Sequence, residues 1–159
     1  MDTQKNIRLK KSAQSLFIEA PGHGSSLCQI RSVITDLARQ IHFSEDEVAK
    51  IEMAVDEACS NVVEHAYSPG REWIWKQRDP EIRLEIHTEH DRLIILISDH
   101  GQRFDFAAYR PADLLERIHG MHRGGYGISI MRRFMDEVEY KSDDKNGNTL
   151  RLVKYLKKS

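Results

Sequence analysis

Two short apolar segments, residues 82–86 and 93–97, constrain the fold of this chain more than any other feature. In 82–86 the apolar residues alternate with charged ones, which is typical of a strand with one exposed face. Residues 93–97 are continuously apolar and fit a more buried neighbouring strand. Because only a short turn at residues 90–91 separates the segments, we predict an antiparallel hairpin. The apolar face of such a sheet must be covered by a second layer.

Two amphipathic helices ahead of this hairpin are predicted to form that layer. Between about 26 and 40, apolar residues recur at helical spacing. A second helix is predicted to begin at Ser44, because Ser44 and Glu47 have the spacing of a capping box. In this motif each side chain accepts a hydrogen bond from the backbone N–H of the other residue. The Ser-Pro-Gly sequence at 68–70 is predicted to end this helix.

The remaining segments complete a two-layer arrangement. Residues 99–124 have no clean period, and we interpret them as a functional lid. The other predicted elements are an edge strand or hairpin within 6–19, a helix at about 126–135, and two closing strands at 137–142 and 148–156. This order predicts a single domain over 1–159 of the α/β (α+β) class: a two-layer α/β sandwich with helices on one face of a mixed, mainly antiparallel sheet.

Composition excludes several classes of protein. Hydrophobic residues make up 40% and charged residues 31%, so the chain is expected to be globular rather than disordered. The formal net charge of −1 argues against a large sequence-independent affinity for nucleic acid. There is no apolar run long enough to span a bilayer, and residues 1–11 lack the apolar region of a signal peptide, so a cytoplasmic location is expected. Cys28 and Cys59 are expected to be buried free thiols, with a lone disulfide as the alternative.

Glu57 and Asn61 form the first candidate site. They are four residues apart on the second predicted helix, so they lie on the same side of it. The amide oxygen of Asn61 is a hard ligand suited to Mg²⁺. A carboxylate one turn away, at Glu57, can accept a proton from a water or hydroxyl that attacks a phosphoryl group. Such pairs are common on solvated helices, so the pair alone does not decide the function.

Three further fragments could complete a nucleotide site. Asp99 follows the buried strand and could accept a hydrogen bond from an exocyclic amine, while Gly101 allows a flat ring to approach the backbone. Residues 123–127 open a helix, whose N-terminus favours an anion, and Arg123 could bind a phosphate. The hydroxyl of Thr149 could reach a phosphate or the adenine-side hydrogen bonds. Taken alone, fragments of this kind are more often ordinary turns or hairpins.

The order of these fragments matches a known family. Residues 51–67 (IEMAVDEACSNVVEHAY) closely resemble the N box of bacterial anti-sigma factor serine/threonine kinases. These kinases belong to the GHKL superfamily of DNA gyrase and the histidine kinases, which shares the Bergerat ATP-binding fold. Residues 99–105 look like the adenine-binding G1 box, 124–138 like the G2 box with its helix, and 147–156 like the closing strand. The resemblance covers essentially the whole chain.

The resemblance implies a role for each candidate. Glu57 would be the general base and Asn61 the Mg²⁺ ligand. Asp99 would bind the adenine amine. The full set of nucleotide-binding residues that the resemblance implies is Asn61, Asp99, Gly101, Arg123, Gly124, Gly125, Gly127 and Thr149. One departure is Arg103, which stands where much of the superfamily has a second glycine.

The resemblance also implies a function. The chain would be an ATP- and Mg²⁺-dependent serine/threonine kinase and anti-sigma factor of a partner-switching system. It would phosphorylate a small STAS-type anti-sigma factor antagonist and otherwise sequester a sigma factor, as a homodimer, without binding nucleic acid or membrane directly. An alternative is a catalytically silent, nucleotide-gated binding module with another regulatory target. The catalytic domain of a sensor histidine kinase is disfavoured, because no upstream hairpin carries a phosphoacceptor histidine.

Overall fold

The computed structural model describes residues 7–66, 81–101, 103, 106 and 126–157. Most of the segment interpreted as a lid therefore lies outside the described residues. The helices and strands follow one another in the order β1 (Arg8–Lys11), β2 (Ser15–Pro21), α1 (Gly24–Gln40), α2 (Glu45–Asn61), η1 (Val62–Ala66), β3 (Glu81–Thr88), β4 (Arg92–Asp99), α5 (Tyr126–Phe134), β5 (Glu137–Asp143) and β6 (Gly147–Tyr155).

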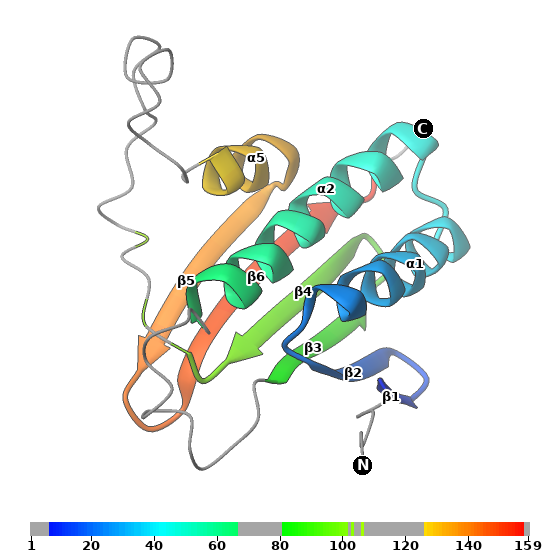
Figure 1. Cartoon of the computed structure of the whole chain (residues 1–159). Helices are drawn as coiled ribbons and strands as arrows, with labels where there is room; N and C mark the ends of the chain where they lie inside the picture. Colours follow the sequence, from blue (N-terminus) through cyan, green and yellow to red (C-terminus); the bar gives the residue numbers. More distant parts are fainter. Residues whose placement is uncertain (1–6, 67–80, 102, 104–105, 107–125, 158–159) are drawn as a thin grey trace, which may run out of the picture.

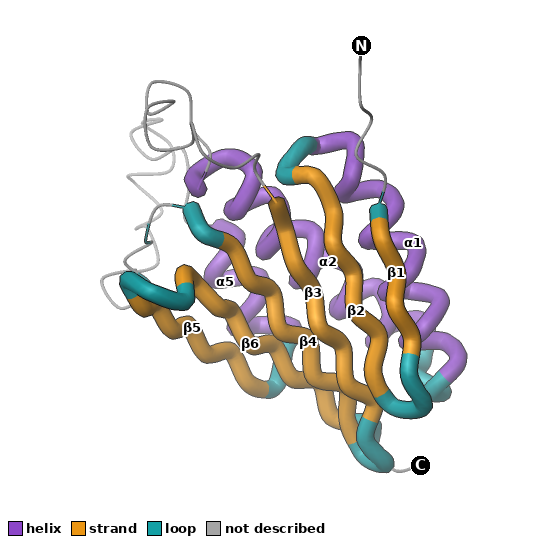
Figure 2. Tube along the Cα trace, turned by 90° about the horizontal axis from the view of Figure 1, so that it is seen from below, coloured by secondary structure: helices purple, strands orange, loops and turns teal. Residues whose placement is uncertain are grey.

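The described elements form two layers. Six strands make one sheet in the order β1-β2-β3-β4-β6-β5. Helices α1, α2 and α5 all lie on one face of this sheet, with α2 between the other two (Figure 1). Among the described residues no helix covers the opposite face, which Figure 2 shows from below. The predicted α/β sandwich is confirmed. None of the described helices is both long and apolar enough to cross a membrane.

The sheet differs from the expected mixed sheet in one respect: every described strand pair is antiparallel. Two helices, rather than one, connect β2 to β3, and the extra reversal returns β3 antiparallel to β2. Strands β4 and β5 run in the same direction, because each is antiparallel to β6. They do not pair with one another, since β6 lies between them.

The core lies between the helices and the inner face of the sheet. On β4, Leu93, Ile95 and Ile97 are at most 1% exposed. The intervening Ile94 and Leu96 are half-buried, because they point to the face without helices. The continuous apolar run of this strand thus serves both faces of the sheet. Burial of each such aliphatic side chain contributes about 1.5–3 kcal/mol to folding.

Helix α2 begins as predicted but changes its winding near its end. Ser44 is the N-cap: its Oγ accepts a hydrogen bond from the backbone N–H of Glu47 at 3.3 Å, and the backbone N–H of Ser44 donates to Glu47 Oε2 at 3.3 Å. The capping box is therefore confirmed. The α-helix ends at Asn61 and continues as the π-helical turn η1. Such turns are frequent at functional sites.

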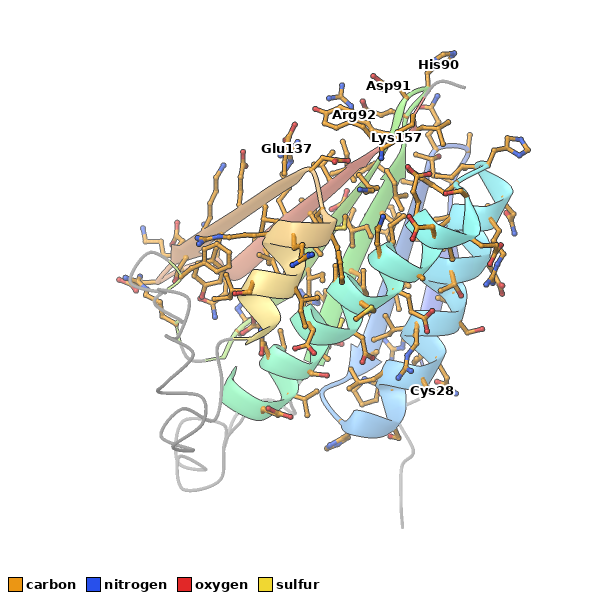
Figure 3. The ribbon with its side chains drawn as sticks, turned by 90° about the horizontal axis from the view of Figure 1, so that it is seen from above. Cys28, His90, Asp91, Arg92, Glu137 and Lys157 are labelled. Carbon is orange, nitrogen blue, oxygen red and sulfur yellow. The ribbon has the colours of Figure 1, made fainter. Side chains whose placement is uncertain are left out.

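The expectation for the cysteines is half correct. Cys59 is buried and free, and burial, followed by the nearby Asp56, raises the pKa of its thiol to about 12. Cys28 is also free, but it is exposed on α1 (Figure 3). The prediction that Cys28 is buried was wrong, because Cys28 lies beside the apolar stripe of α1 and not within it: Ile30 and Ile34 face the core instead.

Lys154 attaches the end of α5 to the sheet. The residue is 6% exposed, although lysine is rarely buried. The Nζ atom donates to the carbonyl oxygen of Phe134 at 2.9 Å and lies 3.5 Å from Asp136 Oδ1. Because Phe134 is the last residue of α5, the ammonium group satisfies a free carbonyl at the negative end of the helix.

Candidate nucleotide-binding site

Glu57 and Asn61 lie on α2 where the first turn of α5 packs against it. Gly127, the second residue of α5, is buried there. A Cβ atom added to Gly127 would lie 2.8 Å from Glu57 Oε2, 3.1 Å from Asn61 Nδ2 and 3.5 Å from Asn61 Oδ1. Both polar side chains therefore face the N-terminal end of α5. The free amides at such an end favour an anionic group.

The surroundings of Glu57 raise the pKa of its carboxyl above the usual value. Burial is the largest cause, and the neighbouring carboxylates of Asp56 and Glu64 add to it. Asp56 is itself paired with Arg31 of α1 at 3.1 Å. A general base is most effective when its pKa approaches the working pH, so the shift at Glu57 is in the useful direction.

Asp99 provides a second polar group, at the end of β4. It is 9% exposed, and the alternation along β4 places it on the helix-facing side, as it does Ile97. Asp99 Oδ1 accepts hydrogen bonds from the backbone N–H of Gly101 at 2.6 Å and from Asn148 Nδ2 at 3.0 Å. Burial raises the pKa of Asp99, and these two hydrogen bonds oppose that rise. The Asx turn at this strand end is present, and it uses Oδ1 alone.

Comparison with known proteins assigns the family. The model of the histidine kinase-like ATPase domain matches residues 23–154. The chain belongs to this family. The serine-protein kinase RsbW of Halalkalibacterium halodurans is 30% identical over 149 residues, which cover 91% of this chain and 85% of the relative. The protein of the same name from Bacillus subtilis is 27% identical over 155 residues, covering 93% of this chain and 89% of the relative. The resemblance to anti-sigma factor kinases is thereby confirmed.

The described part of this histidine kinase-like ATPase contains groups that fit a nucleotide with Mg²⁺. The amide of Asn61 and the carboxylate of Glu57 both face Gly127, at the start of α5. Oxygen atoms of this kind are hard ligands, and Mg²⁺ in nucleotide sites takes only one or two protein groups besides water and phosphate. Arg123, Gly124 and Gly125 lie outside the described residues, so their predicted phosphate contacts remain predictions.

Thr149 does not share a face with Asp99. It is paired with Ser98, and its Oγ1 lies 3.1 Å from Ser98 Oγ. Adjacent residues of a strand point to opposite faces, so both hydroxyls lie on the face without helices. Ser98 lines a cavity of about 730 Å³ on that face. The structure therefore brings together Glu57, Asn61 and Gly127, and separately Asp99 and Gly101, but not Thr149 with either group.

Asn148 is the residue beside Asp99 that our reasoning from the sequence missed. The register pairs Asp99 with Asn148, which is 3% exposed. The alternation along the strands indicates only that the partner of Asp99 on β6 must face the helices, as Asp99 does. That partner could be identified only once the register between β4 and β6 was known.

Proposed function

We propose that this protein is an ATP-dependent serine/threonine kinase and anti-sigma factor of a partner-switching system. The observation that carries the proposal is the close approach of Gly127 to Glu57 and Asn61, which leaves a carboxylate and an amide facing a helix N-terminus. The printed names of the relatives, serine-protein kinases, support the same activity. The substrate would be a small STAS-type antagonist protein, and the sequestered partner a sigma factor. We further propose a homodimer in the cytoplasm.

Each residue would have a distinct role in phosphoryl transfer. Asp99 would accept a hydrogen bond from the adenine amine, with Gly101 below the ring. Asn61 would hold Mg²⁺, which when bound neutralises charge on the phosphates. Glu57 would take the proton from the serine or threonine hydroxyl of the substrate. The hydroxyl oxygen then bonds to the γ-phosphorus, the bond from this phosphorus to the bridging oxygen breaks, and ADP leaves.

The test is transfer of labelled γ-phosphate from ATP to purified candidate antagonists in the presence of Mg²⁺. Replacing a general base lowers the rate by about 10²- to 10⁴-fold, so Glu57→Gln should reduce transfer by that factor while ATP still binds. Glu52→Gln is the matched control, because Glu52 is a carboxylate on the same helix that faces Arg31 at 3.9 Å.

The outcomes separate the alternatives. If wild type binds ATP but transfers phosphate to no candidate, the kinase proposal fails and the nucleotide-gated binding module is favoured. If wild type transfers phosphate and Glu57→Gln does so equally fast, Glu57 is not the base. Release of a captured sigma factor when the antagonist is added with ATP, and its retention with ADP, would support partner switching.

A further inference from the structure

A chain of hydrogen bonds connects Asp99 to the β5–β6 hairpin through Asn148. The side-chain amide of Asn148 donates from Nδ2 to Asp99 Oδ1 at 3.0 Å and to the carbonyl oxygen of Gly101 at 3.1 Å. Its own oxygen, Oδ1, accepts from the Ser142 hydroxyl at 2.8 Å. Ser142 Oγ in turn accepts from Arg103 Nε at 2.8 Å, and the same guanidinium donates to Asp144 Oδ1 at 2.9 Å.

We propose that Asn148 is a positioning residue for recognition of the purine base. It holds the Asp99 carboxylate through Oδ1, which leaves Oδ2 to accept a hydrogen bond from the exocyclic amine of adenine. Arg103 and Ser142 fix the orientation of the Asn148 amide. This inference rests on the proposed function, because it takes Asp99 as the residue that binds the base.

The direction of every hydrogen bond in the series from Arg103 to Asp99 is determined by the groups at its two ends. A guanidinium can only donate, and an ionised carboxylate can only accept. Because Ser142 Oγ accepts from Arg103, its hydroxyl hydrogen is free to point to Asn148 Oδ1. Both amide hydrogens of Asn148 then point to acceptors, Asp99 Oδ1 and the Gly101 carbonyl. A flipped amide would bring its oxygen against two other acceptors, so one orientation is strongly preferred.

The arrangement determines which oxygen of Asp99 is available. Both hydrogen bonds that the described residues give this carboxylate go to Oδ1. Burial raises the pKa of Asp99, and the hydrogen bonds from Asn148 and Gly101, together with the neighbouring His100, oppose that rise. An ionised Asp99 accepts from the amine of adenine and repels the carbonyl oxygen that guanine has at the same position.

These hydrogen bonds assign a structural role to Arg103. It stands where the resemblance leads one to expect a second glycine, and its side chain is held against the hairpin by Ser142 and Asp144. The arginine that departs from the family pattern is therefore the first donor in the series of hydrogen bonds that ends at Asp99.

The experiment measures ATP and GTP affinity by titration calorimetry on the full chain with Mg²⁺, from mildly acidic to neutral pH. In Asn148→Leu, which has a similar shape but no donor, we expect ATP to bind about tenfold more weakly or worse, since a lost hydrogen bond to a charged group has an effect of this size. GTP affinity should change little. The pH below which ATP affinity falls should move upward, because Asp99 loses a donor that favours its ionised form.

Two further variants make the result decisive. Ser98→Ala removes a hydroxyl next to Asp99 but on the opposite face, so its ATP affinity and pH profile should match wild type. Ser142→Ala leaves Asn148 in place and removes the donor that orients its amide. ATP affinity should therefore fall, and its pH profile should move upward, by less than in Asn148→Leu. This variant serves if Asn148→Leu does not fold. If wild type does not bind ATP, the proposed function is overturned. If wild type binds ATP and the folded Asn148 or Ser142 variant has an unchanged affinity and pH profile, this inference alone is overturned.

Discussion

Gly127 and Glu57 are in such close contact that position 127 has no room for a side chain: a Cβ atom there would lie 2.8 Å from Glu57 Oε2. The atom that would have to move is the end of a flexible side chain rather than backbone. A substitution at Gly127 should therefore displace the carboxylate without disrupting the fold.

We expect Gly127→Ala to reduce phosphoryl transfer by about tenfold or more, because misplacing a reacting group by about 1 Å can slow a reaction by about 10²-fold. Its stability to urea should be unchanged or higher, since alanine is favoured over glycine within a helix by up to about 1 kcal/mol. Gly24→Ala is the matched control, because a Cβ at Gly24 meets nothing within 4 Å. Equal transfer by Gly127→Ala and wild type would show that the contact has no functional importance.

The pH dependence of transfer should report the carboxyl group of Glu57. A general base must be ionised, and because the pKa of Glu57 is raised, activity should be lost on acidification at a higher pH than for an ordinary glutamate. Asp56→Asn removes one cause of this shift, so the acidic limb of the rate profile should move to lower pH. The movement should be modest, since burial is the larger cause. Asp36→Asn, on the exposed side of α1, should leave the limb in place. A shift to higher pH in Asp56→Asn would contradict this account.

Thr149→Val tests the register at the end of the sheet. The family resemblance assigns Thr149 to nucleotide binding, whereas its hydroxyl is bonded to Ser98 on the face away from the helices. We expect ATP affinity in this variant to remain within about twofold of wild type, a difference below 0.5 kcal/mol. A tenfold loss of affinity, measured by calorimetry, would instead support the assignment from the resemblance.

Lys154→Met should destabilise the protein by about 1–3 kcal/mol, because it leaves a helix-terminal carbonyl without its buried donor and removes the contact with Asp136. The measurement is urea unfolding followed by circular dichroism. Lys157→Met provides the control, since Lys157 is exposed near the β3–β4 turn (Figure 3). Equal stability of the two variants would mean that Lys154 is not needed to hold the end of α5.

Local features of the fold were predictable from the sequence alone. The capping box at Ser44 depends on residues three positions apart, and the β3–β4 hairpin depends on alternation across a short turn. Interactions of this range depend mainly on neighbouring residues, so a sequence pattern indicates them directly. The placement of Glu57 and Asn61 on one side of α2 is a local feature of the same kind. The family resemblance over residues 51–67 could likewise be recognised from the sequence.

The tertiary structure decided what depends on register and on packing between distant segments. Which residue of β6 lies beside Asp99 follows from a pairing across 49 positions of sequence, and a shift of one residue exchanges Asn148 for Thr149 and one face of the sheet for the other. Cys28 is exposed because of the way α1 turns its apolar stripe to the sheet. The contact of Gly127 with Glu57 likewise exists only because α5 packs against α2. Patterns local in the sequence therefore indicated the elements and the candidate chemistry, whereas long-range packing set which side chains meet.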